Sequence, residues 1–149
     1  MESQKRFELS DNDKLSIAQA VFGEGANASP EVMKMMAQSM INRARSGRKE
    51  DFGATIPEIL QKGYYAVSKQ NKPYKQAVSN KFPDALSKEK WGIAQQVVKN
   101  ILQDQDFGDV LFYFTPEEET EMKKKGKKVF DFSKVKPKGK ADKYNLYSY

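Results

Sequence analysis

Residues 21–42, reading VFGEGANASPEVMKMMAQSMIN, constrain the fold more than any other stretch of this chain. Apolar residues recur at helical spacing before Gly23, and a methionine-rich apolar stripe follows Pro30. Between these two patterns Glu24 lies between Gly23 and Gly25, where one helix stops and another is about to start. We therefore predict two core helices joined by a short turn, with a carboxylate at the C-terminal end of the first.

A carboxylate at that place has an unusual electrostatic setting. Burial and the helix macrodipole both oppose its ionisation, so the pKa of Glu24 should be raised. A general acid that protonates a sugar oxygen near neutral pH needs such a carboxyl group. Glu24 is therefore the candidate catalytic acid. The alternative is an ordinary solvated turn residue between two flexible glycines.

The composition narrows the chemistry that is open to the chain. Its 149 residues include no cysteine and no histidine. This excludes disulfides, thiolate metal sites, cysteine nucleophiles, His-based triads and most zinc sites. With 38% hydrophobic and 31% charged residues, we expect one domain over residues 1–149, with no membrane span, metal or cofactor. The N-terminal residues lack the apolar region of a secretory signal, so we expect synthesis in the cytoplasm without a signal peptide.

Positive charge is concentrated near the C-terminus. Ten lysines between Lys123 and Lys143, against Asp131 and Asp142, give a local balance of +8, whereas the rest of the chain carries −2. A lysine-rich C-terminal segment at about 123–149 could hold an anionic cell-wall polymer, nucleic acid or an acidic protein surface. It could equally be a solvated turn that keeps the protein soluble. Because few aromatic residues are interleaved with these lysines, nucleic acid is the less favoured partner.

Capping signals predict the remaining helices. A Ser or Thr followed by Pro or Glu opens most of the helical patterns, and we take Ser87 as the cap of the longest one. Helices are predicted over about 11–25, 30–44, 55–60, 87–105 and 116–126.

The C-terminal part contains the strand signals. The apolar and aromatic run 109–114 is typical of a strand, and a second short strand is predicted at 129–132. Residues 64–83 are predicted to form a loop with at most one short helix. The tail after 132 has no apolar period, so its tyrosines either pack back on the domain or the tail moves freely. The fold class is therefore mainly α (α+β), with a small β-hairpin or short strands near the C-terminus.

Four blocks between about Leu15 and Phe130 carry a resemblance to a known family. They are LSIAQAVFGEGANASPEVMKMMAQSMINRARS, TIPEILQKGYYAV, the helix from Trp91 to Leu102, and DVLFYFTP. In order and spacing they resemble the SleB-type cell-wall hydrolases, the spore-cortex-lytic family of peptidoglycan-cleaving domains. The first block is similar to the family's aromatic-Gly-Glu turn and to its helix ending in Asn-Arg, here Asn42 and Arg43.

The resemblance implies a compact lysozyme-like helical domain with Glu24 at the position of the catalytic glutamate. It implies cleavage of the β-1,4 bond between N-acetylmuramic acid and N-acetylglucosamine, by lytic transglycosylation or by hydrolysis. Transglycosylation needs one carboxyl group, whereas a hydrolase needs a second; Glu31, Asp51 and Glu58 stay open for that role. The implied partner is the glycan strand of peptidoglycan, reached at the cell wall by a phage-encoded or virion-associated enzyme.

The same resemblance suggests substrate-binding residues. Tyr64, Tyr65 and Tyr113 are candidates to line a glycan cleft, because aromatic faces pack on sugar C–H surfaces; their alternative is core or loop packing. Asn42 either holds the turn around Glu24 or caps its own helix end.

The chain also departs from the family pattern. Ala28 stands where a second acidic residue is usual, Tyr64 where Gln is common and Thr115 where Asn is expected. Lysine replaces the histidine of a closing Gly-x-His-Val-Phe motif in residues 126–130. A non-catalytic basic protein, which binds nucleic acid or an acidic partner or serves in an assembly on the same fold, is the alternative function.

Overall fold

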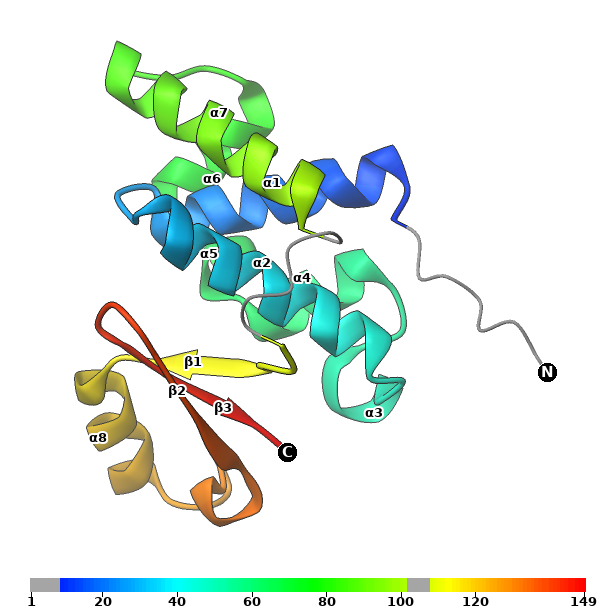
Figure 1. Ribbon diagram of the computed structural model, residues 1–149, viewed down its shortest axis with the longest axis vertical. Coiled ribbons are helices and arrows are strands. Elements are labelled where there is room, and N and C mark those ends of the chain that lie inside the picture. Colours follow the sequence, from blue (N-terminus) through cyan, green and yellow to red (C-terminus); the bar gives the residue numbers. More distant parts are fainter. Residues whose placement is uncertain (1–8, 102–107) are drawn as a thin grey trace, which may run out of the picture.

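The computed structural model describes residues 9–101 and 108–149. A helical body, α1 to α7, lies on one side, and a C-terminal unit of β1, α8, β2 and β3 lies on the other (Figure 1). The predicted class, mainly α with a small sheet near the C-terminus, is confirmed. No helix in the described ranges has the length and apolar character needed to cross a bilayer. The elements are α1 (Asp11–Gly25), α2 (Pro30–Arg45), α3 (Lys49–Phe52), α4 (Ile56–Gly63), α5 (Tyr65–Ser68), α6 (Lys72–Ser79), α7 (Ala85–Asn100), β1 (Phe112–Phe114), α8 (Pro116–Lys125), a 3-10 turn η1 (Phe132–Lys134), β2 (Lys136–Ala141) and β3 (Tyr144–Ser148).

The first two helices begin where their caps predict. The Ser10 hydroxyl accepts from the Asp13 N–H, and the Ser29 hydroxyl accepts from the Val32 N–H just before Pro30. Each cap satisfies a backbone donor that has no partner within the first turn. The two helices then pack against each other, and the turn between them follows Gly25 as expected.

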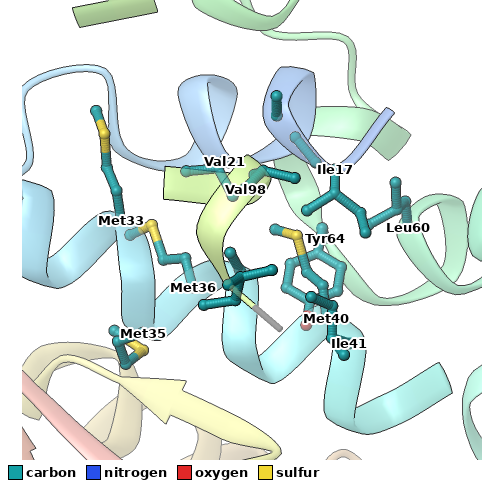
Figure 2. Packing of buried hydrophobic residues seen from close by; sticks show 14 of the residues in the cluster. Ile17, Val21, Met33, Met35, Met36, Met40, Ile41, Leu60, Tyr64 and Val98 are labelled. Atoms are coloured by element: carbon teal, nitrogen blue, oxygen red, sulfur yellow. The ribbon is translucent and has the colours of Figure 1, made fainter. Parts of the chain in front are cut away.

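The core sits between these helices and the elements that cover them. Helix α1 packs against α2, α4, α5, α6 and α7, so it is surrounded by protein over much of its length. The methionine stripe of α2 is core, as predicted, since Met33, Met36 and Met40 are fully buried (Figure 2). Flexible thioether side chains fill the irregular space between crossing helices.

Two predicted details of the helical body are wrong. Residues 64–83 hold two short helices, α5 and α6, rather than at most one. The second is capped by the Asn71 side chain, which accepts from the Tyr74 N–H. Helix α7 is capped by Asp84, whose carboxylate accepts from the Ser87 N–H at 2.7 Å; Ser87 itself lies inside the helix. The predicted end at Gln105 lies outside the described residues.

The C-terminal unit is a three-stranded antiparallel sheet in the order β1-β3-β2. Tyr113 pairs with Leu146 on the central strand β3. The strand predicted over 109–114 is shorter, and the predicted strand at 129–132 is absent, because Phe132 instead begins the turn η1. The tail that showed no apolar period forms the β2–β3 hairpin. Its edge strand β2 carries exposed lysines at positions 136, 138 and 140, so it shows no alternation of apolar and polar residues. Exposed lysines are common on edge strands.

Helix α8 is fixed to the sheet by a buried carboxylate. Thr115 and Glu118 form the predicted capping box at its start. The carboxylate of the next residue, Glu119, accepts from the Asn145 amide and from the Tyr147 hydroxyl. Burial and this contact raise the pKa of Tyr147 to about 12, so its hydroxyl stays a donor. The helix is thereby held against β3.

Candidate active site

Glu24 lies in the last turn of α1, at the C-terminal end where the sequence places it. Its carboxylate is held from two other elements. Oε2 accepts from the Ala66 N–H of α5 at 3.0 Å, and Oε1 accepts from the Tyr113 hydroxyl of β1 at 2.8 Å. Three segments that are distant in the sequence therefore converge on one side chain.

The expected direction of the Glu24 pKa is confirmed. Burial raises the pKa of Glu24 above that of an ordinary carboxyl, and this effect outweighs the two hydrogen bonds from Ala66 and Tyr113, which lower it. The charge of Glu118 raises the pKa further, whereas the Arg43 guanidinium lowers it. The side chain is thus partly buried and favours its protonated form more than a solvated turn residue does.

The residue before the acid has no room for a side chain. A Cβ at Gly23 would lie 2.8 Å from the Ala66 Cβ and 2.9 Å from the Tyr74 Cβ. The Asn71 amide also donates to the Gly23 carbonyl at 2.9 Å, which fastens the end of α1 to the start of α6. This close approach brings the Ala66 N–H within reach of Glu24.

A cavity of about 330 Å³ opens beside Glu24. One wall is the stretch from Gly23 to Ala28 with Val32, and another residue at its margin is Pro73. The remaining lining comes from residues 142–144, in the turn of the β2–β3 hairpin. This turn begins 118 positions after Glu24 in the sequence. The acid therefore lies beside a hollow whose walls come from both halves of the chain.

Tyr113 contacts Glu24 but is not among the residues that line the cavity. Its ring contacts Tyr144 edge to face with centroids 5.4 Å apart, and it lies tilted against Tyr64 at 6.3 Å. Burial and then the charge of Glu24 raise the pKa of Tyr113 well above its usual value. Its hydroxyl is therefore a persistent donor to the carboxylate.

The two consecutive tyrosines after Gly63 lie apart from this cavity. Tyr64 is buried, with 2% of its surface exposed, and its hydroxyl lies 2.9 Å from the Ser39 Oγ. Because the Ser39 hydroxyl donates to the Met36 carbonyl, Tyr64 is the donor to Ser39. Tyr65 is 68% exposed. Neither side chain is among those that line the cavity beside Glu24.

Asn42 has neither of the two roles predicted for it, which were to hold the turn around Glu24 or to cap its own helix. Its amide donates to the carbonyls of Gly108 and Val110 at 2.8 and 2.7 Å, and its oxygen accepts from Gln38. It holds the chain that enters β1 against α2. The C-terminal cap of α2 is Ser46.

Arg43 continues this connection. Its Nε donates to the Leu111 carbonyl at 2.9 Å, and its guanidinium lies 4.7 to 5.0 Å from the ring centroids of Phe52, Tyr64 and Phe112. Such contacts hold a cation among aromatic faces. Asn42 and Arg43 together set the position of β1, and so of the Tyr113 hydroxyl. The signal in the sequence was the Asn-Arg pair at the end of the helix.

The three other carboxylates considered in the sequence are placed elsewhere. Asp51 forms an ion pair with Arg48 at 3.3 Å, and Glu58 accepts from the Ala54 N–H at 3.0 Å. Glu31 is exposed in the first turn of α2. None of the three lines the cavity beside Glu24. Within the described ranges, no cluster of three Asp or Glu side chains suited to a metal ion is found.

Sequence reasoning missed the hairpin turn as a part of this site. Asp142, Lys143 and Tyr144 line the cavity, yet they lie in a tail without apolar periodicity. The adjacent lysines predicted a charged binding segment or a solvated turn rather than an ordered hairpin. The turn signal was weak, because Asp142 has a positive φ of 52° where glycine or asparagine is the more usual residue.

A larger hollow of about 370 Å³ lies away from Glu24, between the end of α2 and the C-terminus, where Arg45, Arg48 and Asp109 line it. It is more open, and its carboxylate, Asp109, is exposed and paired with Lys138, so we place the candidate site at the smaller cavity. Comparisons with protein-family models, with curated proteins and with solved structures find no match to this chain, and its function has to be inferred from the geometry around Glu24.

Proposed function

We propose that this protein is a peptidoglycan glycosidase that cleaves the β-1,4 bond between N-acetylmuramic acid and N-acetylglucosamine, with Glu24 as the catalytic acid. One observation carries the proposal. A carboxyl group with a raised pKa stands beside a cavity and is oriented by two hydrogen bonds from separate elements. General acids that act on glycosidic oxygens need this combination of a retained proton and a fixed position.

The surroundings of Glu24 suit both halves of a single-carboxyl reaction. Burial keeps the proton on Glu24 until it passes to the glycosidic oxygen. The carboxylate that results accepts from the Ala66 N–H and the Tyr113 hydroxyl, which stabilise its negative charge. It can then take the proton of the attacking hydroxyl, which is the C6 hydroxyl of the muramyl sugar in a lytic transglycosylase. This cycle leaves a 1,6-anhydro end.

The placement of the other carboxylates favours transglycosylation over hydrolysis. A hydrolase needs a second carboxylate about 5 to 9.5 Å from the acid. Glu31, Asp51 and Glu58 do not line the cavity. Asp142 does line it, but its charge is not among the groups that shift the pKa of Glu24. Glu118 does raise that pKa, but it does not line the cavity, and its Oε1 accepts from the Thr115 N–H in the cap of α8.

Digestion of purified peptidoglycan tests the proposal. Mass analysis of the released sugars should find anhydromuropeptides, whereas reducing ends would indicate hydrolysis. The matched variant is Glu24→Gln, whose amide can accept from Ala66 and donate to the Tyr113 oxygen. We expect it to lose at least about 100-fold of the activity while it stays folded. Retained lysis by this variant would reject Glu24 as the acid.

A non-catalytic basic binding or assembly protein is the second candidate function. The ten lysines between Lys123 and Lys143 are all exposed, so they are available to an anionic cell-wall polymer, an acidic protein or nucleic acid. Saturable binding to such a polymer that weakens with salt, without any change to the glycan, would support this function. It would leave the buried carboxyl of Glu24 without a role.

A further inference from the structure

We propose that Lys143, in the turn of the β2–β3 hairpin, binds a carboxylate substituent of the glycan and so makes the site selective for acidic saccharides. The inference rests on the proposed function, because it assigns the substrate's negative group to one residue of the cavity that Glu24 shares. The contacts of this turn carry it.

The first observation is where the turn lies. Lys143 lines the same cavity as Glu24, and its neighbour Tyr144 presents a partly buried ring there. That ring is supported edge to face by Tyr113, the residue that donates to Glu24. A sugar that occupies the cavity would thus lie between the acid and the lysine, with an aromatic side chain beside it.

The second observation is that Lys143 has no carboxylate partner within residues 9–101 and 108–149. Its Nζ lies 5.6 Å from the centroid of the Tyr144 ring, which is a weak contact at an exposed position. Lys138, on the same hairpin, is paired with Asp109 at 3.5 Å. Lys143 therefore keeps its charge available to a ligand.

The third observation is the separation of the two functions. The groups that shift the pKa of Glu24 include Glu118 and Arg43 but not Lys143. The ammonium group can therefore hold an anion without lowering the pKa of Glu24. A lower pKa would leave Glu24 less often protonated. A glycosidic oxygen at Glu24 and a carboxylate at Lys143 would be separate parts of one bound saccharide.

Asp142 provides a second test of the proposal, in which the effect on binding is opposite to that of Lys143. It lines the cavity next to Lys143, and its charge raises the pKa of Tyr144, so it is close to the ring. Its negative charge must oppose an anionic substituent. Removal of that charge should strengthen the binding of an acidic glycan, whereas a catalytic role for Asp142 would make the same change reduce turnover.

Binding measured by calorimetry in the Glu24→Gln full-length protein separates recognition from cleavage. The probes are glycan strands stripped of peptide, which carry lactyl carboxylates, glycan strands with intact peptide stems, and neutral chitooligosaccharides of the same length. We expect Lys143→Gln to weaken the acidic probes roughly 3- to 5-fold and leave the neutral probe unchanged. The acidic probe that responds more identifies the source of the carboxylate.

Two further variants complete the test. Asp142→Asn should tighten the acidic probes by a similar factor, and Lys140→Gln, an exposed lysine of β2 outside the cavity lining, should change nothing. Equal effects of Lys143→Gln on acidic and neutral probes, or no effect on either, overturn the inference. If the wild-type protein cleaves peptidoglycan in either case, the proposed function survives; if it neither binds nor cleaves any glycan, both are rejected.

Discussion

The core of the helical body is mostly aliphatic and rich in methionine, with an aromatic group of Phe22, Phe82 and Trp91. The C-terminal unit is built mainly from aromatic rings and lysines. Phe112, Phe114, Phe130, Phe132 and Tyr147 form a connected cluster of ring contacts at the sheet. The helical body supplies the acid, and the C-terminal unit supplies its hydroxyl donor and the far wall of the cavity. In the function that we propose, the helical body carries Glu24, and the C-terminal unit presents the hairpin turn with Lys143 and Tyr144 to the glycan.

The first prediction compares the two cores. Met40→Ala should lower the free energy of unfolding by about 2–5 kcal/mol, because Met40 is fully buried in the helical body. Phe132→Ala, in the partly exposed ring cluster, should cost less. Urea denaturation measures both, and Leu15→Ala, at a position 44% exposed on α1, is the control with little effect. Equal losses for Met40 and Phe132 would show that the two regions share stability evenly.

The second prediction concerns the contact between the two regions. Tyr113→Phe removes the hydroxyl that donates to Glu24 and keeps the ring. Because that donor stabilises the ionised carboxylate, the pKa of Glu24 should rise further, and the alkaline limb of the pH–activity profile should move to higher pH. We expect activity near neutral pH to fall by roughly tenfold, from the loss of a charge-assisted hydrogen bond. Tyr64→Phe, which loses only the contact with Ser39, should leave the limb in place.

A smaller effect tests a cap of the helical body. Asp84→Ala should lower the free energy of unfolding, because its carboxylate caps α7. Ser87→Ala should cost less, since it keeps the backbone N–H that donates to Asp84 and loses only the contact of the Ser87 hydroxyl with that carboxylate. Thermal or urea unfolding of the two single variants decides between them; a larger loss for Ser87 would restore the cap inferred from the sequence.

The smallest expected effect is a pH dependence of stability that belongs to Glu24. The folded protein holds this proton more tightly than the unfolded chain, because burial raises the folded pKa. The contribution of Glu24 to stability is therefore lost as the pH rises from below the ordinary carboxyl pKa through the raised value. Glu24→Gln has no carboxyl group to ionise at this position. Relative to the wild type, its free energy of unfolding should therefore be higher near pH 7 but not at about pH 4. A constant difference at both pH values would contradict the raised pKa.

The helical body was largely predictable because its signals are local. The caps at Ser10 and Ser29, and the methionine period of α2, are read within one or two turns of sequence, as is the Thr115 cap of α8 in the C-terminal unit. Glu24 was found in the same way, since an acidic residue between two glycines at the end of an apolar helix is a local feature.

The remainder of the site depends on contacts between distant residues. The Ala66 N–H reaches Glu24 because helices pack closely at Gly23, and no feature of residues 64–68 indicates this. The β2–β3 hairpin depends on pairing with β1 across the chain, and its exposed edge carries no apolar alternation. Asn42 bonds to carbonyls 66 and 68 positions away, so its partners could not be read from its own helix.

The two glycines that flank the acid have different surroundings, and mutational tolerance should follow them. At position 25, an added methyl group would lie 3.0 Å from the end of the flexible Met36 side chain, which can move aside, and 3.0 Å from the Cβ of Ala28 in the adjoining turn. At position 23, it would meet the Cβ atoms of two helices that cannot withdraw without parting from α1. A library that randomises both codons should therefore recover small residues besides glycine at position 25 and glycine alone at position 23.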